Sequence, residues 1–152
     1  MSIGKINSPW IAQGLNIFES RIKKYVNFSP IVIPDIKNAK SLSMESIKEE
    51  EGKLILSNLS QSDLVVIMDE KGSEFTSRQF ADWMQKQMNS GRKRMMFIIG
   101  GPFGFSKSVY YRSDFKIALS KMTLTHEMAK LVLTEQIYRS LTILRGEPYH
   151  HD

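Results

Sequence analysis

The chain has 152 residues and no cysteine, with 41% hydrophobic residues, 24% charged residues and a formal net charge of +5. This composition predicts one globular domain over residues 1–152. The absence of cysteine excludes disulfides and thiolate metal sites. The adjacent His150 and His151 lack a usual metal-ligand spacing, so no metal is expected. No apolar run reaches the roughly 18 residues of a membrane span and no signal peptide is recognisable, so a cytoplasmic protein without membrane contact is expected.

Strand and helix patterns alternate along the first half of the chain. Ser8 and Pro9 predict a helix start, because proline fits the first helical position, and apolar residues follow at steps of three and four. Glu49, Glu50 and Glu51 lie in a later helix and are expected to form a solvated face. The predicted elements are a strand over 2–6, a helix over 8–25, a strand over 28–33, a polar linker over 35–43 and a helix over 44–58.

The second half continues this alternation, and its first two strands are apolar at every position. LVVIM at 64–68 and MMFII at 95–99 are typical of a sheet covered on both sides. The order of elements predicts an α/β fold with a parallel sheet and helices on both faces. The remaining elements are a turn over 69–72, a helix from Thr76 or Ser77 to Gly91, a glycine-rich loop over 100–105, a short helix from Ser106 to Tyr111, and a strand over 116–119.

A long apolar helix is predicted over 125–144, capped by Thr123 or Thr125 and stopped by a glycine and a proline. Lys130, Thr134 and Tyr138 recur at a spacing of four and are expected to line a polar edge. The apolar arc of the helix is wider than one packed face needs. We therefore expect this helix to contact both its own sheet and a second subunit.

Ligands of parallel sheets bind at the carboxyl ends of the strands, where the predicted loops 69–73, 100–105 and 120–123 lie. Glycines in the loop over 100–105 would let its backbone approach a ligand closely. That loop lacks the GxGxxG spacing and a Walker lysine, which argues against a dinucleotide or triphosphate site. Taken alone, it fits a tight turn better than a ligand site.

Four motifs in order resemble one protein family. They are VVIMDEKG, FTSRQFADWMQ, IIGGPFGFS followed by LSKMTL, and the terminal ILRGEPYHHD. Together they resemble the RlmH family, SPOUT-class methyltransferases that modify a pseudouridine of large-subunit ribosomal RNA. The resemblance covers nearly the whole chain, which departs from the family at Thr125, where proline is common.

The resemblance implies a C-terminal trefoil knot, S-adenosylmethionine as methyl donor, and a homodimer. Met68 would offer a soft apolar surface to an adenine ring, and a loop outside strand and helix leaves backbone groups for the ring edge. For Met68 and Leu124, core filling is an equally good interpretation. Carried over by position, the cofactor residues are Met68, Gly100, Leu119, Ser120, Lys121, Met122, Thr123 and Leu124.

The reaction implied by the resemblance methylates N3 of a pseudouridine in 23S ribosomal RNA, in the large subunit or the assembled ribosome. It requires alignment of methyl group and nucleophile and removal of one proton, without a covalent enzyme intermediate. The family implicates the tail residues Tyr149 and His150 in RNA contact, and the basic Arg139 suits a phosphate. His126 is expected to be a capping or buried polar group. No residue is assigned as general base.

Two other functions are compatible with the same residues. One is a non-catalytic RNA-binding module of the same fold, which the departure at Thr125 keeps open. The other is a small-molecule α/β enzyme that uses the loop at Gly100 for a different nucleotide. The net positive charge permits an RNA partner without establishing one.

Overall fold

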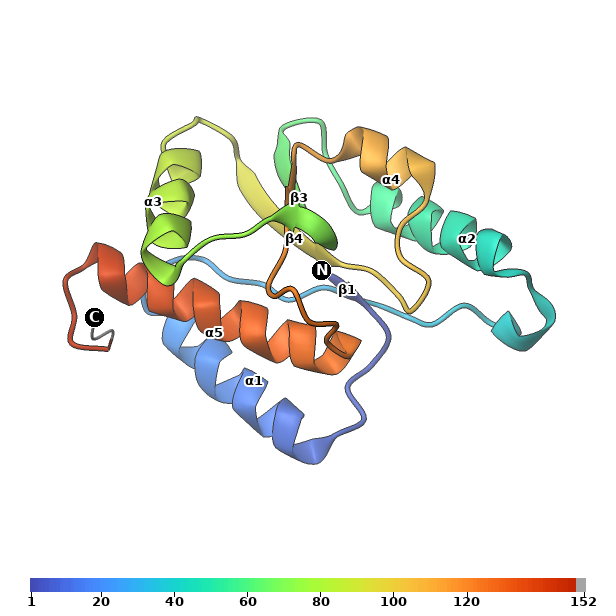
Figure 1. Ribbon diagram of the computed structural model, residues 1–152, viewed down its shortest axis with the longest axis horizontal. Helices are drawn as coiled ribbons and strands as arrows, with labels where there is room; N and C mark the ends of the chain where they lie inside the picture. The colour runs from blue at the N-terminus through green and yellow to red at the C-terminus, as the bar shows by residue number, and fades with distance from the viewer. Residues whose placement is uncertain (150–152) are drawn as a thin grey trace.

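Five parallel strands form the central sheet of the computed structural model, which describes residues 1–149 (Figure 1). Their order across the sheet is β2-β1-β4-β3-β5, and each neighbouring pair is parallel. The predicted parallel sheet is therefore confirmed. The strands are β1 (Ser2–Ile3), β2 (Val32–Ile33), β3 (Asp63–Ser73), β4 (Arg94–Ile99) and β5 (Phe115–Ile117).

Helices cover both faces of this sheet, as predicted. On one face α5 packs between α1 and α3, and on the other α2 packs against α4 (Figure 1). A short 3-10 turn, Ala39–Ser41, precedes α2. The helices are α1 (Pro9–Ile22), α2 (Met44–Ser57), α3 (Ser77–Met88), α4 (Lys107–Arg112) and α5 (His126–Leu144).

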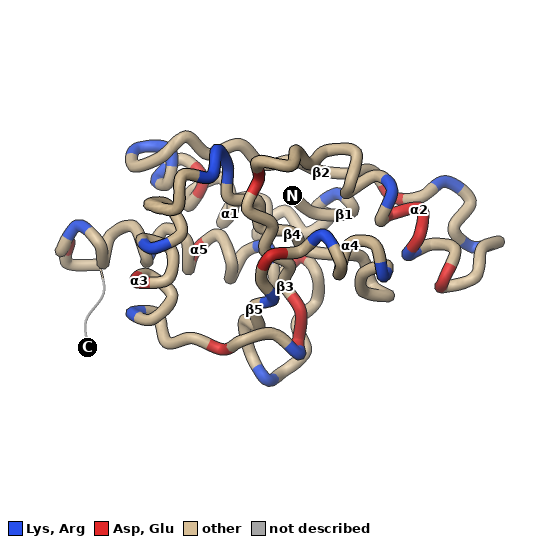
Figure 2. The backbone as a smooth tube through the Cα atoms, turned by 90° about the horizontal axis from the view of Figure 1, so that it is seen from above, with Lys and Arg blue, Asp and Glu red and all other residues tan. Residues whose placement is uncertain are grey.

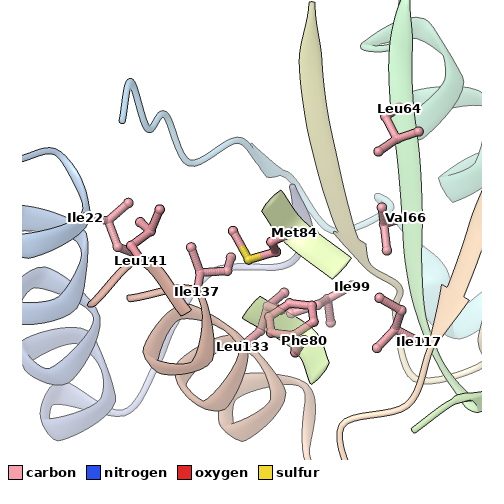
Figure 3. Packing of buried hydrophobic residues seen from close by; sticks show 10 residues of the cluster. All are labelled: Ile22, Leu64, Val66, Phe80, Met84, Ile99, Ile117, Leu133, Ile137 and Leu141. Carbon is pink, nitrogen blue, oxygen red and sulfur yellow. The ribbon is translucent and has the colours of Figure 1, made fainter. Parts of the chain in front are cut away.

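Alternate residues of β3 fill two different cores. Leu64 and Val66 face α3 and α5, where they share a buried cluster with Phe80 and Leu133 (Figure 3). Val65 and Ile67 belong to the opposite cluster, under α2 and α4. Because side chains of a strand point to alternate faces, a strand between two helical layers must be apolar at every position. The run at 64–68 satisfies that requirement.

The helix starts agree with the sequence because each expected capping side chain is in place. Thr76 accepts from the amide of Gln79 at 3.2 Å, and the Gln79 side chain accepts from the Thr76 amide in return. Thr125 accepts from the amide of Met128 at 3.3 Å at the start of α5. Each bond satisfies an amide that the first helical turn leaves without a partner.

The boundaries of four strands differ from the prediction. The predicted turn at 69–72 is wrong, because β3 continues to Ser73, whose carbonyl accepts from the amide of Ala118 at 3.0 Å. Gly72 permits this close approach, since a Cβ there would lie 2.5 Å from the amide nitrogen of Ile117. The strands expected over 2–6 and 28–33 are only two residues long each. The fifth strand ends at Ile117, two residues before the predicted end.

Two predicted solvent-facing groups are buried instead. On α5, Lys130 and Thr134 are each 7% exposed, so the expected polar edge points inward. The Lys130 ammonium donates to the carbonyl of Gly4 at 2.8 Å, and Thr134 donates to the carbonyl of Lys130 at 2.7 Å. On α2, Glu51 is 5% exposed, so the acidic run is not a solvated face throughout. Polar groups can be buried where backbone partners satisfy them.

An ion pair fixes β3 to β4 at the sheet edge opposite the predicted ligand loops. The carboxylate of Asp63, which is buried, accepts from Arg94 at 2.6 and 2.8 Å and from the Ser60 amide at 2.7 Å. The guanidinium of Arg94 is the main cause that holds the pKa of Asp63 below its usual value. The pair therefore stabilises the fold far from the site.

Arg94→Met is expected to lower the free energy of unfolding measurably, because it leaves the buried carboxylate of Asp63 with fewer donors. Urea denaturation at neutral pH measures the loss. Since the pKa of Asp63 is lower in the folded state, the difference persists above the unfolded pKa of about 3.9 and disappears as pH falls through the folded value. Arg92→Met is the control, because Arg92 reaches Asp114 only at 3.6 Å on a half-exposed surface. Equal losses in both variants would contradict this account.

Candidate functional site

The carboxyl ends of β4 and β5 lie on either side of Met68, from which β3 continues to Ser73. Met68 of β3 is paired with Ile99 of β4 on one side and with Ile117 of β5 on the other. Gly100 directly follows Ile99, and Leu119 lies two residues beyond Ile117. The structure thus brings Met68, Gly100 and the start of the 119–124 stretch to one edge, where parallel sheets bind ligands.

The glycine-rich loop has a fixed shape with contacts on its inner side. The amide of Gly104, which has a φ of 80°, donates to the carbonyl of Gly101 at 3.2 Å. A Cβ on Gly100 would lie 3.0 Å from the buried ring of Phe105. A Cβ on Gly101 would lie 2.5 Å from a carboxylate oxygen of Glu51. Both glycines are therefore required by internal packing, and the loop offers backbone rather than side chains to a ligand.

The stretch 119–124 crosses the same edge as an irregular loop. Leu119 is half-buried and, like Met68, packs against the core under α3 and α5. The hydroxyl of Ser120 accepts from the amide of Met122 at 2.9 Å, and the Met122 side chain is 78% exposed. Lys121 approaches Glu74 at 3.7 Å. The side chains of Lys121, Met122 and Thr123 are therefore at the surface, whereas Leu119, Ser120 and Leu124 are half-buried.

Tyr110, which the sequence did not indicate, contacts Asp69 of the predicted loop 69–73 at this edge. The Tyr110 hydroxyl of α4 donates to the carboxylate of Asp69, which directly follows Met68 in β3. Burial, then the contact with Asp69, raises the pKa of Tyr110 to about 12. This phenol keeps its proton at neutral pH and serves as a donor. The sequence predicted a turn at 69–72, which would not place Asp69 against α4. The contact between Tyr110 and Asp69 forms because β3 continues through Asp69.

The start of α5 lies against the start of α1 beside the site loops. Glu127, which is buried, accepts from the amide of Asn7 at 2.7 Å, and hydrogen bonds from Ser8 and Asn7 lower its pKa. His126 is exposed, while Thr125 provides the helix cap. The expectation that His126 caps the helix or is buried is therefore wrong, because the preceding threonine already satisfies the helix start.

Arg139 and Tyr149 form one cluster on the last half of α5. Arg139 binds the carboxylate of Glu135 at 2.6 Å and lies 4.8 Å from the centre of the Tyr149 ring. The Tyr149 hydroxyl donates to Glu135 at 3.1 Å, and its ring packs edge-on against Tyr138. These contacts hold the chain after Gly146 beside the last turns of α5 (Figure 1). His150, the third predicted RNA contact, lies outside the described residues.

This cluster is not at the same place as the strand ends. Arg139 is thirteen residues beyond His126 on one helix, which corresponds to about 20 Å along its axis. The predicted cofactor residues and the predicted RNA residues of one protomer therefore occupy two ends of α5. A single protomer does not bring them together.

A cavity of about 600 Å³ lies elsewhere, between α1, α5, β4 and the segment 26–32. Its lining is mainly apolar and includes Lys130, but none of the loop residues 100–105 or 119–124. Within residues 1–149, no group of three or more His, Asp or Glu side chains is placed to hold a metal ion. None of the described helices is long and apolar enough to cross a membrane.

Comparison with known proteins matches these features to one family. A family model described as "Predicted SPOUT methyltransferase" matches residues 1–150. A protein of Parabacteroides distasonis named ribosomal RNA large subunit methyltransferase H is 49% identical over 150 residues, covering 99% of this chain and 96% of its own. A protein of the same name from Christiangramia forsetii is 48% identical over 149 residues, covering 98% and 95% respectively. The chain therefore belongs to the SPOUT methyltransferase family, in the branch of ribosomal RNA large subunit methyltransferase H.

Proposed function

We propose that the protein transfers a methyl group from S-adenosylmethionine to N3 of a pseudouridine in 23S ribosomal RNA. The observation that carries this proposal is the meeting of the ends of β4 and β5 and two irregular loops beside Met68, in a chain that matches curated methyltransferases over nearly its full length. The proposal includes a trefoil knot at the C-terminal segment and action in the cytoplasm on the large subunit or ribosome.

The residues at this edge fit an adenosyl ligand. Met68 is half-buried within β3, between the last residues of β4 and β5, where its thioether can cover an apolar ring. The loops at Gly100 and Leu119–Leu124 offer backbone donors and acceptors that can read a ring edge and ribose hydroxyls. S-adenosylmethionine supplies an activated methyl group when bound. The protein needs only to hold that group in line with the nucleophile and exclude water.

Removal of the N3 proton is not assigned to a residue. A phenol with a pKa of about 12, as at Tyr110, does not act as a base at neutral pH. Burial beside Glu135 likewise raises the pKa of Tyr149, which favours a role as donor. Both tyrosines are therefore proposed to hold and orient RNA rather than accept its proton.

The protein is proposed to act as a homodimer through α1 and α5. On α1, Trp10 is 60% exposed and Ile17 is 43% exposed, although both are large and apolar. Leu131 of α5 lies over Gly14 between them and is half-buried. Burying such side chains contributes roughly 1.5–3 kcal/mol each, so a few per protomer suffice for a tight pair. The apolar arc predicted for α5 thus continues onto α1.

A dimer also resolves the separation between the two ends of α5. Because Tyr149 is held far from the loops of its own protomer, we propose that the tail and Arg139 meet RNA at the partner's site. The basic residue Lys107 begins α4 directly after the glycine-rich loop and Ser106, and Figure 2 shows Lys and Arg on that helix. Contacts of such residues with phosphates position RNA and make its binding salt-dependent.

Ile17→Arg is expected to convert the dimer to monomers, because it places a charge in the proposed interface. Light scattering at micromolar concentration measures the mass. Met44→Arg is the matched control, since Met44 is 64% exposed at the start of α2, on the other face of the sheet (Figure 1). A wild-type monomer, or a dimer that tolerates arginine at position 17, would refute this interface.

Titration calorimetry with S-adenosylmethionine, ATP and NAD tests the proposed cofactor. We expect heat of binding with S-adenosylmethionine and none with the other two. Binding of ATP or NAD alone would favour a small-molecule enzyme. Tight RNA binding without any cofactor binding would favour the non-catalytic RNA-binding module, which Thr125 keeps as the second candidate.

A further inference from the structure

The chain turns back directly after α5 in a defined backbone conformation. Gly146 has a φ of 65°, which glycine adopts without strain. Its amide donates to the carbonyl of Ile143 at 3.0 Å, and the amide of Glu147 donates to the carbonyl of the buried Thr142 at 3.0 Å. This pair of bonds is the glycine-containing turn that commonly ends a helix. It sets the direction in which the chain leaves α5.

Tyr25 contacts this segment through both its hydroxyl and its ring. It lies three residues after the end of α1 and is half-buried. Its hydroxyl donates to the carboxylate of Glu147, 122 positions further along the chain. The guanidinium of Arg145 lies over the Tyr25 ring, 5.1 Å from its centre. A hydrogen bond to a carboxylate is roughly twice as strong as one between neutral groups, and the cation–π contact adds to it.

The position of Tyr149 depends on these contacts. The amide of Tyr149 donates to the carbonyl of Glu147 at 2.8 Å, across Pro148. The rings of Tyr25 and Tyr149 both pack edge-on against Tyr138, with centre distances of 6.0 and 4.7 Å respectively. Because Tyr25 holds Glu147 and shares Tyr138 as a neighbour with Tyr149, it restricts where the Tyr149 ring lies.

The segment that Tyr25 holds is a surface segment. Arg145 and Pro148 are exposed, and Glu147 and Tyr149 are only half-buried. The hydrogen bond to Glu147, then burial, raises the pKa of Tyr25 to about 12, so the phenol remains a donor at neutral pH. These contacts therefore keep a surface segment in one place under physiological conditions. Such an arrangement before binding lowers the entropy cost of meeting a partner.

We propose that Tyr25 is a positioning residue, which fixes the tail segment 147–149 in the place from which Tyr149 meets the RNA. This inference rests on the proposed function. Tyr25 acts through the carboxylate of Glu147 and the ring of Tyr138, so it does not itself have to touch the RNA. The role also explains why an acidic residue, Glu147, stands in a segment proposed to meet an anionic partner.

Tyr25→Phe tests this role because it removes the hydroxyl and keeps the ring beneath Arg145 and against Tyr138. We expect the single-turnover rate on ribosomes or large subunits, at saturating RNA and cofactor, to fall about tenfold through loss of one charge-assisted hydrogen bond. The affinity for S-adenosylmethionine should stay within twofold of wild type, because the proposed cofactor loops are untouched. Tyr111→Phe is the matched control, since it removes a hydroxyl from a ring that is 95% exposed on α4.

The same substitution in a chain that lacks residues 148–152 separates positioning from a role in the fold. If Tyr25 acts through the tail, Tyr25→Phe lowers the rate of the shortened chain no further. An equal loss in the full and the shortened chain would show that Tyr25 supports the fold and would overturn the inference. The double variant of Tyr25→Phe with Glu147→Gln should be no slower than the slower single variant, and additive losses would count against the proposed contact.

NMR relaxation of the Tyr149 amide, measured without RNA or cofactor, separates this inference from the proposed function. We expect a lower order parameter for this amide in Tyr25→Phe and an unchanged one in Tyr111→Phe. Equal order parameters in wild type and Tyr25→Phe would overturn the positioning role even if methyl transfer is confirmed. If the wild type transfers no methyl group, the proposed function fails, and loss of order at Tyr149 would still support Tyr25 as the residue that fixes the tail.

Discussion

Gly100→Val is expected to weaken S-adenosylmethionine binding at least a hundredfold. The side chain would begin 3.0 Å from the ring of Phe105, which is buried in the core beneath α2 and α4. A branched side chain there presses on this ring, so we expect the loop backbone to shift toward the proposed cofactor site. Calorimetry of the purified protein, together with its melting curve, measures both consequences.

A second substitution separates lost packing from lost binding. Phe105→Leu shortens the obstructing side chain, so the double variant with Gly100→Val should regain much of its melting temperature. Its affinity should stay low, because a branched residue still stands at the strand end beside Met68. Recovery of affinity together with stability would show that Gly100 serves internal packing alone. Unchanged affinity in the single variant would remove this edge as the cofactor site.

Deletion of residues 148–152 is expected to reduce methyl transfer by two or more orders of magnitude, since misplacing reacting groups by about 1 Å can cost a hundredfold. S-adenosylmethionine binding should survive, because Met68, Gly100 and the stretch 119–124 are untouched. The deletion removes the contacts of Tyr149 with Glu135 and Arg139 on a half-exposed surface. The melting temperature should therefore fall only slightly. A single-turnover assay on ribosomes and large subunits measures the rate.

Tyr149→Phe is the matched control for the deletion. It keeps the ring against Tyr138 and Arg139 and removes only the hydroxyl that reaches Glu135. We expect it to retain most of the rate if the ring is the important group. Mixed dimers of the deleted chain and a Gly100→Val chain should regain about half of the sites if the tail acts across the dimer. Full activity of the truncated dimer would show that the tail plays no part in the reaction.

The periodicity of apolar residues predicted the layers of the fold, because the spacing of apolar residues along a helix or strand shows which of its faces are buried. The all-apolar runs at 64–68 and 95–99 identified the two central strands, and the caps Thr76 and Thr125 fixed two helix starts. Short edge elements could not be predicted in this way. β1 and β2 have two residues each, and a pattern of period two cannot be recognised over two residues.

The candidate site residues were predicted through the resemblance, whereas the buried contacts around them could be found only in the structure. The sequence contained Glu51 within an exposed-looking acidic run, and only packing against Gly101 reveals its burial. Lys130 was assigned to a polar edge, yet backbone carbonyls of Ile3 and Gly4 satisfy its ammonium inside the protein. Such contacts join residues more than forty positions apart, so local patterns do not contain them.

Mass-spectrometric mapping of 23S ribosomal RNA from cells that lack the gene tests the proposed methyl transfer most directly. We expect one pseudouridine to lose its N3 methyl group in these cells and to regain it when the wild-type chain is supplied, but not when the Gly100→Val chain is supplied. Persistence of every methylated pseudouridine in the deleted strain would contradict the proposed function.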